Sequence, residues 1–326
     1  MLDRTPIEVT VEDIGAARER IRDSVTRTPL LRLPPDALGD HASPEVWLKL
    51  ENLQPIGSFK LRGAANAMAL ASPERLAGGV FTASAGNMAQ GVAWNARRLG
   101  IPCRVVVPDH APTTKLEAIE RLGGEIIKVP FDEWWQVLVT HEFPALEGLF
   151  IHPVSDPAVI AGNGTIGLEI LEDLPDVGTV IVPFGGGGLS SGIASALRAK
   201  KPGAKVYACE VETAAPLAAS LAAGEPTEVE YVASFVDGIG GKSLLPEMWP
   251  LVRELLAGSI VVSLDQVAAA LRLLAERCRI IAEGAGAASV AAAFSGAGGE
   301  GPVVCVISGG NIDAQKLATI LAGETP

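Results

Sequence analysis

Short apolar runs rich in β-branched residues alternate with amphipathic segments along most of this sequence. The apolar runs predict strands that begin near residues 46, 79, 103, 125, 149, 179, 205 and 303. The amphipathic segments predict helices at 90–100, 114–124, 164–174 and 191–203, and several of them end in glycine, as helices often do. This alternation predicts an α/β fold with βαβ units and a mostly parallel sheet.

The number of predicted strands exceeds what one mononucleotide-binding unit uses, which favours two domains. A polar turn bracketed by Pro153 and Pro157 marks a boundary between them. We expect residues 76–152 to form a smaller α/β domain that is inserted into a larger one, which comprises residues 1–75 and 153–326.

Charge and composition exclude some classes of function for this chain. The chain of 326 residues carries a net charge of −12, and its pI is about 4.9. Binding to nucleic acid or to an anionic membrane would need a basic face, so neither is expected as the main partner. The N-terminus is polar and acidic, and no apolar run is long enough to span a membrane, so we expect a cytoplasmic protein.

Four consecutive glycines, Gly185 to Gly188, join a predicted buried strand directly to a predicted helix. Backbone without Cβ atoms can turn its N–H groups toward one point, and the start of a helix adds a positive dipole. The loop is therefore predicted to bind a phosphate. It is not a P-loop, and although Glu210 stands at the spacing of a dinucleotide fingerprint, four adjacent glycines followed by Leu189 suit one compact phosphate better.

Two further loops place polar side chains at predicted strand ends. Ser84, Gly86, Asn87 and Gln90 stand at the start of a helix, where hydroxyl, amide and free N–H groups can bind an anion such as a carboxylate. Simple capping of that helix is the alternative. Ser308 ends the last predicted strand, at the edge where open α/β sheets bind ligands.

Lys60 stands between Phe59 and Leu61 at the start of another predicted helix. Burial among apolar neighbours lowers the pKa of a lysine, which can then act as nucleophile, imine partner or base. A lysine, a phosphate loop and a hydroxyl that can face a ring point together to a phosphorylated aldehyde held as an imine. That cofactor is pyridoxal 5'-phosphate.

Six segments of the sequence match one known family, in the order of that family. They are ENLQPIGSFKLRGA, SAGNMAQGVA, IHPVSDPAVIAGNGTIGLEIL, GGGGL, IIAEGAGAASVAAA and ISGGNID, within residues 28–315. Together they resemble the fold-type II pyridoxal-phosphate enzymes of the threonine/serine dehydratase and serine racemase group. The resemblance implies two open, mostly parallel α/β domains of the tryptophan-synthase β type, with the active site between them.

The resemblance also implies roles for the residues above. Lys60 would form the Schiff base and take the Cα proton, and Phe59 would pack against the cofactor ring. Asn87 would bind the ring hydroxyl, and Ser308 would face the pyridine nitrogen, where a neutral hydroxyl favours prompt loss of a β-substituent. The cofactor phosphate is the expected proton donor to the leaving hydroxyl. The remaining contacts would be Gly185, Gly186, Gly187, Gly188 and Leu189 to the phosphate, and Ser84, Ala85, Gly86, Asn87 and Gln90 to the substrate.

Two departures from the family bear on the reaction. Serine racemases of the group carry a second catalytic serine on the opposite face of the substrate, and Ala85 stands at that position here. Without a second base the proton cannot readily return on the other face, so dehydration is expected in preference to racemisation. Met88 replaces the usual histidine, and we interpret it as a core residue that leaves the substrate preference open.

A third departure concerns a divalent cation that many relatives bind. Glu210 and Ala214 match two of the ligand positions, but Pro216 stands where the family has an aspartate. Because such a cation needs several oxygen ligands, we expect this site to be weakened or lost.

The roles of three other features of the sequence can be interpreted in more than one way. Glu283 resembles a family acid near the cofactor that is either catalytic or orients a loop. The adjacent residues Trp134 and Trp135 lie in a segment that is shorter than in the family. They either line a pocket, contribute to an oligomer contact or pack within the domain. His152 is interpreted as a buried core histidine and not as a catalyst.

The expected activity is that of a threonine/serine dehydratase, which converts a β-hydroxy amino acid to a 2-oxo acid and ammonia. The alternatives are a racemase of the same fold, a nicotinamide-dependent dehydrogenase, and a binding module without catalysis; the last two leave Lys60 without a role. The resemblance also implies a homodimer. Since the chain ends soon after ISGGNID, we expect no C-terminal regulatory domain.

Overall fold

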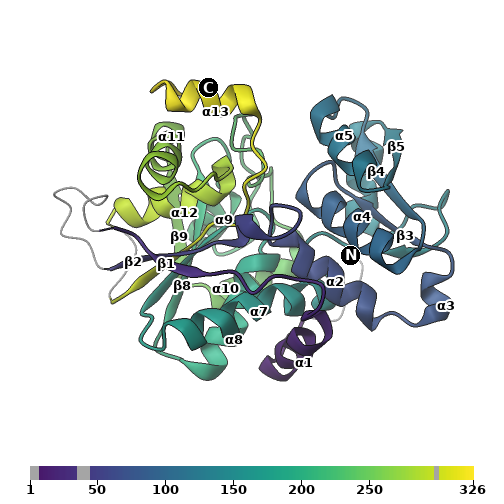
Figure 1. The fold of residues 1–326 in the computed structure, drawn as a ribbon, viewed down its shortest axis with the longest axis horizontal. Coiled ribbons are helices and arrows are strands. Elements are labelled where there is room, and N and C mark those ends of the chain that lie inside the picture. The colour runs from purple at the N-terminus through teal and green to yellow at the C-terminus, as the bar shows by residue number, and fades with distance from the viewer. Residues whose placement is uncertain (1–6, 35–44, 297–300) are drawn as a thin grey trace.

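The computed structural model describes residues 7–34, 45–296 and 301–326, and its strands form two separate sheets (Figure 1). The larger sheet contains β1 (Leu30–Arg32), β2 (Val46–Lys49), β7 (Thr179–Pro183), β8 (Lys205–Val211), β9 (Gly258–Val262) and β10 (Val303–Val306). The strand order across this sheet is β1-β2-β10-β7-β8-β9. All neighbouring pairs are parallel except β1 with β2. Strands from both ends of the chain therefore lie in one sheet.

The smaller sheet is built from a continuous part of the chain. Its strands are β3 (Val80–Ala83), β4 (Cys103–Pro108), β5 (Glu125–Val129) and β6 (Leu149–Phe150). They are all parallel, in the order β5-β4-β3-β6. The helices that accompany them are α3 (Pro73–Leu76), α4 (Asn87–Leu99), α5 (Thr113–Arg121) and α6 (Phe131–Thr140). The domain boundaries at 76 and 152 stay a prediction, and the four strands fall within that range.

The remaining helices accompany the larger sheet or join the two sheets. They are α1 (Val11–Ile21), α2 (Lys60–Leu70), α7 (Pro157–Asp173), α8 (Gly188–Lys200), α9 (Pro216–Ala223), α10 (Trp249–Leu255), α11 (Leu264–Leu273), α12 (Gly284–Phe294) and α13 (Ala314–Leu321). Short helical segments are η2 (Glu51–Leu53), η3 (Pro246–Met248) and η4 (Leu274–Cys278), the last of which is a π-helix.

Both faces of the larger sheet are buried. In β7, Ile181 belongs to the core that includes α11 and α12, whereas Val180 and Val182 belong to the core that includes α7 and α8. Figure 1 shows the first pair of helices above the sheet and the second pair below it. Parallel sheets with helices on both faces need such continuously apolar strands, which is why the apolar runs could be recognised in the sequence.

Glycines allow α2, α7 and α8 to touch backbone to backbone. A Cβ atom added at Gly162 of α7 would lie 2.5 Å from the carbonyl oxygen of Arg62 in α2. One added at Gly192 of α8 would lie 2.4 Å from the carbonyl oxygen of Ile160 in α7. These approaches leave no room for any side chain, so the three helices form one closely packed body.

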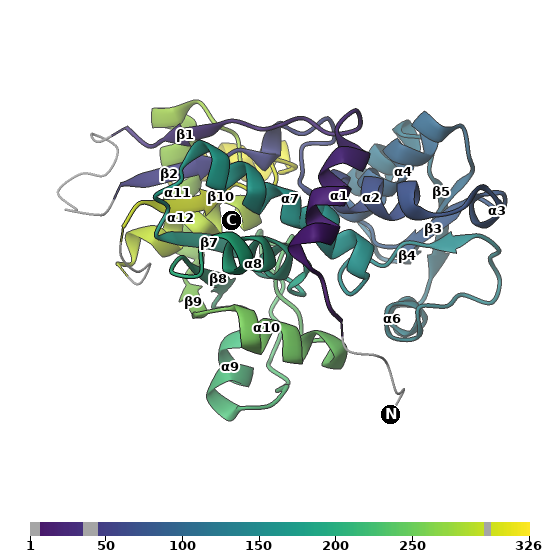
Figure 2. The ribbon, with the colours of Figure 1, turned by 90° about the horizontal axis from the view of Figure 1, so that it is seen from below.

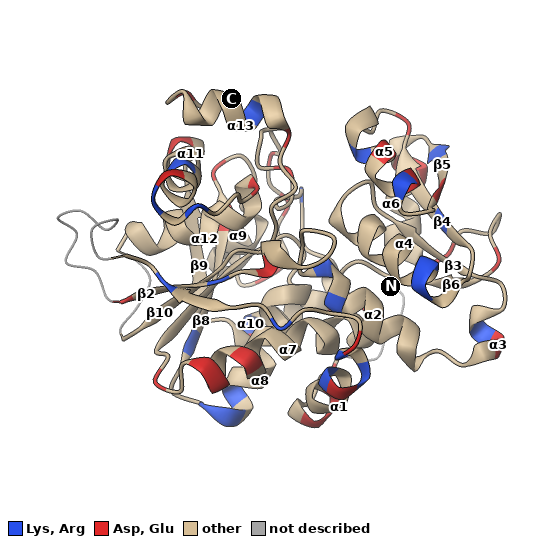
Figure 3. Cartoon of the chain, viewed as in Figure 1, with Lys and Arg blue, Asp and Glu red and all other residues tan. Residues whose placement is uncertain are grey.

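Helix α1 packs against α2, α7 and α8, and it lies between the two sheets in the view from below (Figure 2). Acidic and basic residues are mixed on α1 and α5, while the strands of the larger sheet are largely free of charge (Figure 3). Within the described residues, no helix combines the length and the apolar character that crossing a membrane would require.

The eight strands predicted from apolar runs are all present, and the prediction of a mostly parallel α/β fold is confirmed. Strands β1 and β9 are not predicted from the sequence. Strand β1 has three residues, too few to show a pattern, and β9 alternates buried with exposed positions at the edge of the sheet, where Val261 is exposed. Edge strands lack the continuous apolar run that marks a central parallel strand.

Candidate functional site

A cavity of about 340 Å³ lies where the carboxyl ends of strands from both sheets face one another. The ends of β3, β7 and β10 lead into its lining through Ser84, the glycine loop and Ser308. Open α/β sheets bind ligands at this edge. Two larger hollows, of about 610 and 570 Å³, include none of the residues predicted for catalysis, for cofactor binding or for substrate binding. The cavity of about 340 Å³ is therefore the candidate active site.

Lys60 is the first residue of α2, and its side chain reaches into the cavity. Its Nζ atom donates a hydrogen bond of 2.6 Å to the carbonyl oxygen of Pro153 and lies 5.2 Å from the centre of the Phe59 ring. Burial lowers the pKa of Lys60 from 10.5 to about 8, because a charged amine loses its hydration there. The amine is consequently available in its neutral, nucleophilic form close to physiological pH.

The glycine loop runs from the end of β7 into the start of α8. Gly187 has a positive φ of 94°, which favours glycine. A Cβ atom added at Gly186 would lie 2.7 Å from Cγ1 of Val154, and one added at Gly188 would lie 2.7 Å from the Val154 carbonyl oxygen. From Gly186 to Gly188 the loop therefore accepts only backbone, and the N–H groups at the start of a 13-residue helix are available to an anion.

Ser308 follows β10 and lies in the cavity wall, with 3% of its surface exposed. Its backbone carbonyl accepts a hydrogen bond of 3.0 Å from the N–H of Phe59. This bond ties the end of β10 to the residue before Lys60. Within the described part of the chain, the Ser308 hydroxyl itself makes no hydrogen bond, so it is free to bind a ligand.

Asn87 begins α4 and links the two sheets. Its Nδ2 atom donates to Glu283 Oε1 at 2.9 Å, and its Oδ1 atom accepts from Asn311 Nδ2 at 2.8 Å. Beside it, the Ser84 hydroxyl accepts a hydrogen bond from the N–H of Gly86. Nothing lies within 4 Å of a Cβ atom added at Gly86, so this loop faces open space.

Most of the predicted site residues meet in the cavity, and one does not. Gln90, one turn into α4, is absent from the lining, whereas the predicted residues that line it are Phe59, Lys60, Ser84, Ala85, Gly86, Asn87, Gly185, Gly186, Gly187, Gly188, Leu189, Glu283 and Ser308. Met88 also touches the cavity but packs mainly in the core of the smaller sheet.

Glu283 lies just before α12, with its carboxylate on Asn87. Burial raises the pKa of Glu283 from 4.5 to about 7, and the hydrogen bond from Asn87 offsets this only in part. The nearby carboxylate of Asp237 raises it further. Glu283 therefore exchanges a proton near neutral pH.

The mouth of the cavity contains residues whose role no sequence motif predicts. Lys115 of α5 donates a hydrogen bond of 2.9 Å to Asp237, which joins the two sides of the cavity. Phe131 and Trp134 of α6 form an aromatic part of the wall, while Trp135 is outside it. The two adjacent tryptophans stand out in the sequence, but Lys115 and Asp237 lie in stretches with no recognisable motif.

Glu210, the first of the two matching cation-ligand positions, is hydrogen-bonded to protein groups. Its carboxylate accepts hydrogen bonds from the N–H groups of Leu217 and Ala218, each at 2.8 Å, and from the Ser259 hydroxyl at 2.6 Å. Pro216 is the first residue of α9, whose start this carboxylate caps. The described residues contain no group of three or more His, Cys, Asp or Glu side chains that could hold a metal ion.

His152 is buried and fully hydrogen-bonded. Its Nδ1 atom accepts from the N–H groups of Val154 and Ser155, and its Nε2 atom lies 3.2 Å from the carbonyl oxygen of Leu138. Burial lowers the pKa of His152 to about 3, and His141, stacked on it, adds to this shift. The neutral ring thus fixes the turn that contains Pro153, the acceptor for Lys60.

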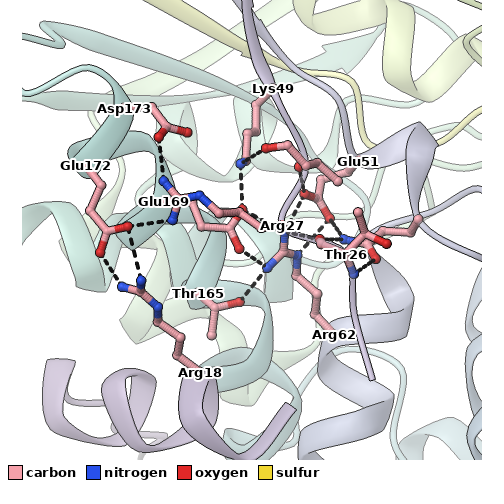
Figure 4. Close-up of polar contacts among 12 residues, drawn as sticks. Arg18, Thr26, Arg27, Lys49, Glu51, Arg62, Thr165, Glu169, Glu172 and Asp173 are labelled. Carbon is pink, nitrogen blue, oxygen red and sulfur yellow. Dashed lines mark hydrogen bonds and ion pairs between the residues drawn. The ribbon is translucent and has the colours of Figure 1, made fainter. Parts of the chain in front are cut away.

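A buried network of charges anchors the helix that carries Lys60 (Figure 4). Arg62 of α2 donates to both oxygens of Glu51 and of Glu169 at 2.6–2.9 Å, and Lys49 donates to Glu169 at 2.6 Å. Burial alone would raise the pKa of Glu51, but the guanidinium of Arg62 lowers it overall. Two cations and two carboxylates balance, which is the condition under which buried charges are tolerated.

Comparison with known proteins shows which family has this arrangement. A family model described as pyridoxal-phosphate dependent enzyme matches residues 21–309. An L-threonine ammonia-lyase of Thermotoga maritima is 41% identical over 316 residues, which cover 96% of this chain and 78% of that protein.

Solved structures agree with that match. Maize serine racemase superposes with a TM-score of 0.86 at 32% identity, over 97% of each chain. The processed form of threonine deaminase isoform 2 from Solanum lycopersicum superposes with a TM-score of 0.86 at 34% identity, over 99% of this chain and 94% of that one. The chain therefore belongs to the family of pyridoxal-phosphate dependent enzymes.

Proposed function

We propose that this chain converts L-threonine, L-serine or a related β-hydroxy amino acid to a 2-oxo acid and ammonia, with pyridoxal 5'-phosphate bound in the cavity at Lys60. The observation that carries the proposal is the meeting of three groups from distant parts of the chain. They are the amine of Lys60, the glycine loop and the hydroxyl of Ser308. The similarity to threonine ammonia-lyases over nearly the whole chain supports it.

The residues of the cavity fit this cofactor. The glycine loop has no room for a side chain at Gly186, Gly187 and Gly188, which leaves its N–H groups for the phosphate. Ser308, whose hydroxyl has no partner in the described chain, would face the ring nitrogen, and Phe59 would pack against the ring. Asn87, held by Glu283 and Asn311, would face the ring hydroxyl. When bound, the cofactor supplies an electron-withdrawing group that makes the Cα proton acidic.

The residues of this chain would then bind the substrate and move its proton. The loop from Ser84 to Asn87 would hold the α-carboxylate through backbone N–H groups and the start of α4. Lys60 Nζ would take the Cα proton, a step for which a pKa of about 8 is well matched to neutral pH. The Pro153 carbonyl keeps the amine in one place, since it accepts a hydrogen bond from either protonation state.

Dehydration is favoured over racemisation because Ala85 lies in the cavity wall with a methyl group where a racemase would need a second base. A proton removed by Lys60 on one face has no partner at that position to return it on the other. Glu283 hydrogen-bonds Asn87 and would orient the loop from Ser84 to Asn87 through it.

The test is an assay of 2-oxo acid formation over a panel of β-hydroxy amino acids of both stereochemistries. We expect a yellow protein that forms a 2-oxo acid and loses this activity completely in Lys60→Ala. A colourless protein that binds a nicotinamide cofactor, or full turnover by Lys60→Ala, would overturn the proposal. Release of a D-amino acid without a 2-oxo acid would identify a racemase instead.

We also infer that the Glu210 position binds no divalent cation, because its carboxylate already accepts three hydrogen bonds from protein groups. Treatment with a chelator is expected to leave turnover unchanged, and restoration of lost turnover by Mg²⁺ would contradict this. A homodimer and a cytoplasmic location stay predictions, which light scattering and cell fractionation test.

A further inference from the structure

We infer that the active-site cavity accepts β-hydroxy amino acids whose β-carbon carries an aromatic group. This inference rests on the proposed function and names the substrate class more narrowly. The observation behind it is an aromatic wall, formed by Phe131 and Trp134, on the same cavity that contains Lys60.

The wall is continuous and reaches the mouth of the cavity. The ring centres of Phe131 and Trp134 are 5.5 Å apart, and both residues come from the first turn of α6. Phe131 is 43% exposed, whereas Trp134 is half-buried. Pro108, at the end of β4, also lines the cavity. A planar apolar group entering from solvent would therefore be covered by aromatic surface.

The topology of the smaller sheet sets the distance between this wall and the proposed carboxylate loop, Ser84 to Asn87. The carboxylate loop follows β3 and the wall follows β5, and β4 lies between these two parallel strands. Two strand spacings amount to roughly 10 Å. The short side chains of serine and threonine would leave most of that span empty, but a phenyl ring on the β-carbon extends well into it.

The charges of the cavity argue against an acidic substituent. Asp237 and Glu283 both line it, and Lys115 is already paired with Asp237. A second substrate carboxylate, as in a hydroxyaspartate, would meet these two acids and find no free cation at the mouth among the described residues that line it. An uncharged ring avoids that cost and can pack on the aromatic wall.

The experiment compares the purified, cofactor-loaded enzyme on L-threonine and on L-phenylserine, by kcat/KM for 2-oxo acid formation. The wild type is expected to use phenylserine at least as well as threonine. In Trp134→Ala, and in Phe131→Ala at its exposed position, the ratio of phenylserine to threonine kcat/KM should fall by about tenfold. Trp134→Phe should keep most of the ratio because it keeps an aromatic ring.

Trp135→Ala is the matched control, since Trp135 is next in sequence but lies outside the cavity. It should leave the ratio unchanged even if it lowers stability. Turnover of threonine with negligible turnover of phenylserine would overturn the inference and leave the proposed function intact. An equal loss on both substrates in Trp134→Ala and Phe131→Ala would also overturn it. Failure of every β-hydroxy amino acid to yield a 2-oxo acid would overturn the proposed function itself.

Discussion

The ε-amino group of Lys60 donates a 2.6 Å hydrogen bond to the carbonyl oxygen of Pro153, 93 residues further along the chain. A carbonyl carries no net charge, so it positions the amine but offsets the cost of burying its charge only in part. The pKa of Lys60 consequently stays lowered, at about 8. The turn that presents this carbonyl is fixed in its place by the neutral ring of His152.

The reactivity of Lys60 in the cofactor-free protein should therefore follow its lowered pKa. An amine is nucleophilic only without its proton, so acylation of Lys60 should rise with pH and level off above about 8. Exposed lysines level off only near their ordinary pKa of about 10.4. Competitive labelling followed by peptide mass spectrometry measures the pH dependence of acylation for Lys60 and for exposed lysines. A midpoint for Lys60 near the ordinary lysine pKa would contradict the structure.

Glu283 should make the cofactor-free protein less stable as the pH rises. Its folded-state pKa of about 7 exceeds the ordinary 4.5, so the folded protein binds more protons than the unfolded chain between these values. Glu283→Gln removes this effect and keeps an acceptor for Asn87. At a pH above about 7, the folded-state pKa, this substitution should raise the free energy of unfolding by up to about 3 kcal/mol. At a pH below 4.5, the ordinary pKa, it should hardly change it. Urea unfolding at both pH values tests this, and an equal effect at both would refute it.

The buried charge network should contribute far more to stability than a surface ion pair. Arg62→Met leaves the carboxylates of Glu51 and Glu169 with one cation fewer, at an expected cost of about 3–5 kcal/mol in the free energy of unfolding. Arg18→Ala, which removes a 38% exposed partner of Glu172, should cost about 1 kcal/mol or less. Similar costs for the two variants would show that the network is not anchored as described.

Gly186 of the glycine loop should not tolerate a methyl group. In Gly186→Ala the new Cβ atom would lie 2.7 Å from the side chain of Val154, so the stiff, β-branched valine or the loop with its N–H groups must shift. We expect the dissociation constant for pyridoxal 5'-phosphate to rise about tenfold or more. Gly203→Ala, where nothing lies within 4 Å, is the control. Unchanged affinity in Gly186→Ala would exclude this loop as the phosphate site.

Ala85→Ser should introduce racemisation. The new hydroxyl would lie in the cavity wall, on the loop proposed to hold the substrate, where it could act as the second base. Chiral chromatography of serine recovered after partial turnover should show D-serine above the wild-type level. If none appears although the variant still forms a 2-oxo acid, the missing base does not explain the preference for elimination.

The sequence predicts those functional residues that are recognisable from their immediate neighbours in the chain. The glycine loop, Lys60 and Ser308 can each be recognised from a few neighbouring residues, and the apolar strands beside them stand out because both faces of the larger sheet are buried. Their convergence on one cavity followed from parallel strands that end at one edge.

Contacts between distant residues could not be predicted in this way. Asn87 and Glu283 are 196 residues apart, and Lys115 and Asp237 are 122 apart, and both pairs depend on how the two sheets face each other. The same holds for Gln90, which shares a motif with Asn87 but stands one helical turn further along α4, outside the cavity lining.

The glycine contacts of α2, α7 and α8 also determine which parts of this sequence are open to evolution. Gly162 and Gly192 admit no side chain, so neither position can vary without displacing the helices that begin with Lys60 and with the glycine loop. Helix α6 is under no such constraint at Phe131, which is exposed at the cavity mouth. A descendant of this enzyme could therefore acquire a new substrate through α6 while Lys60 stayed in place.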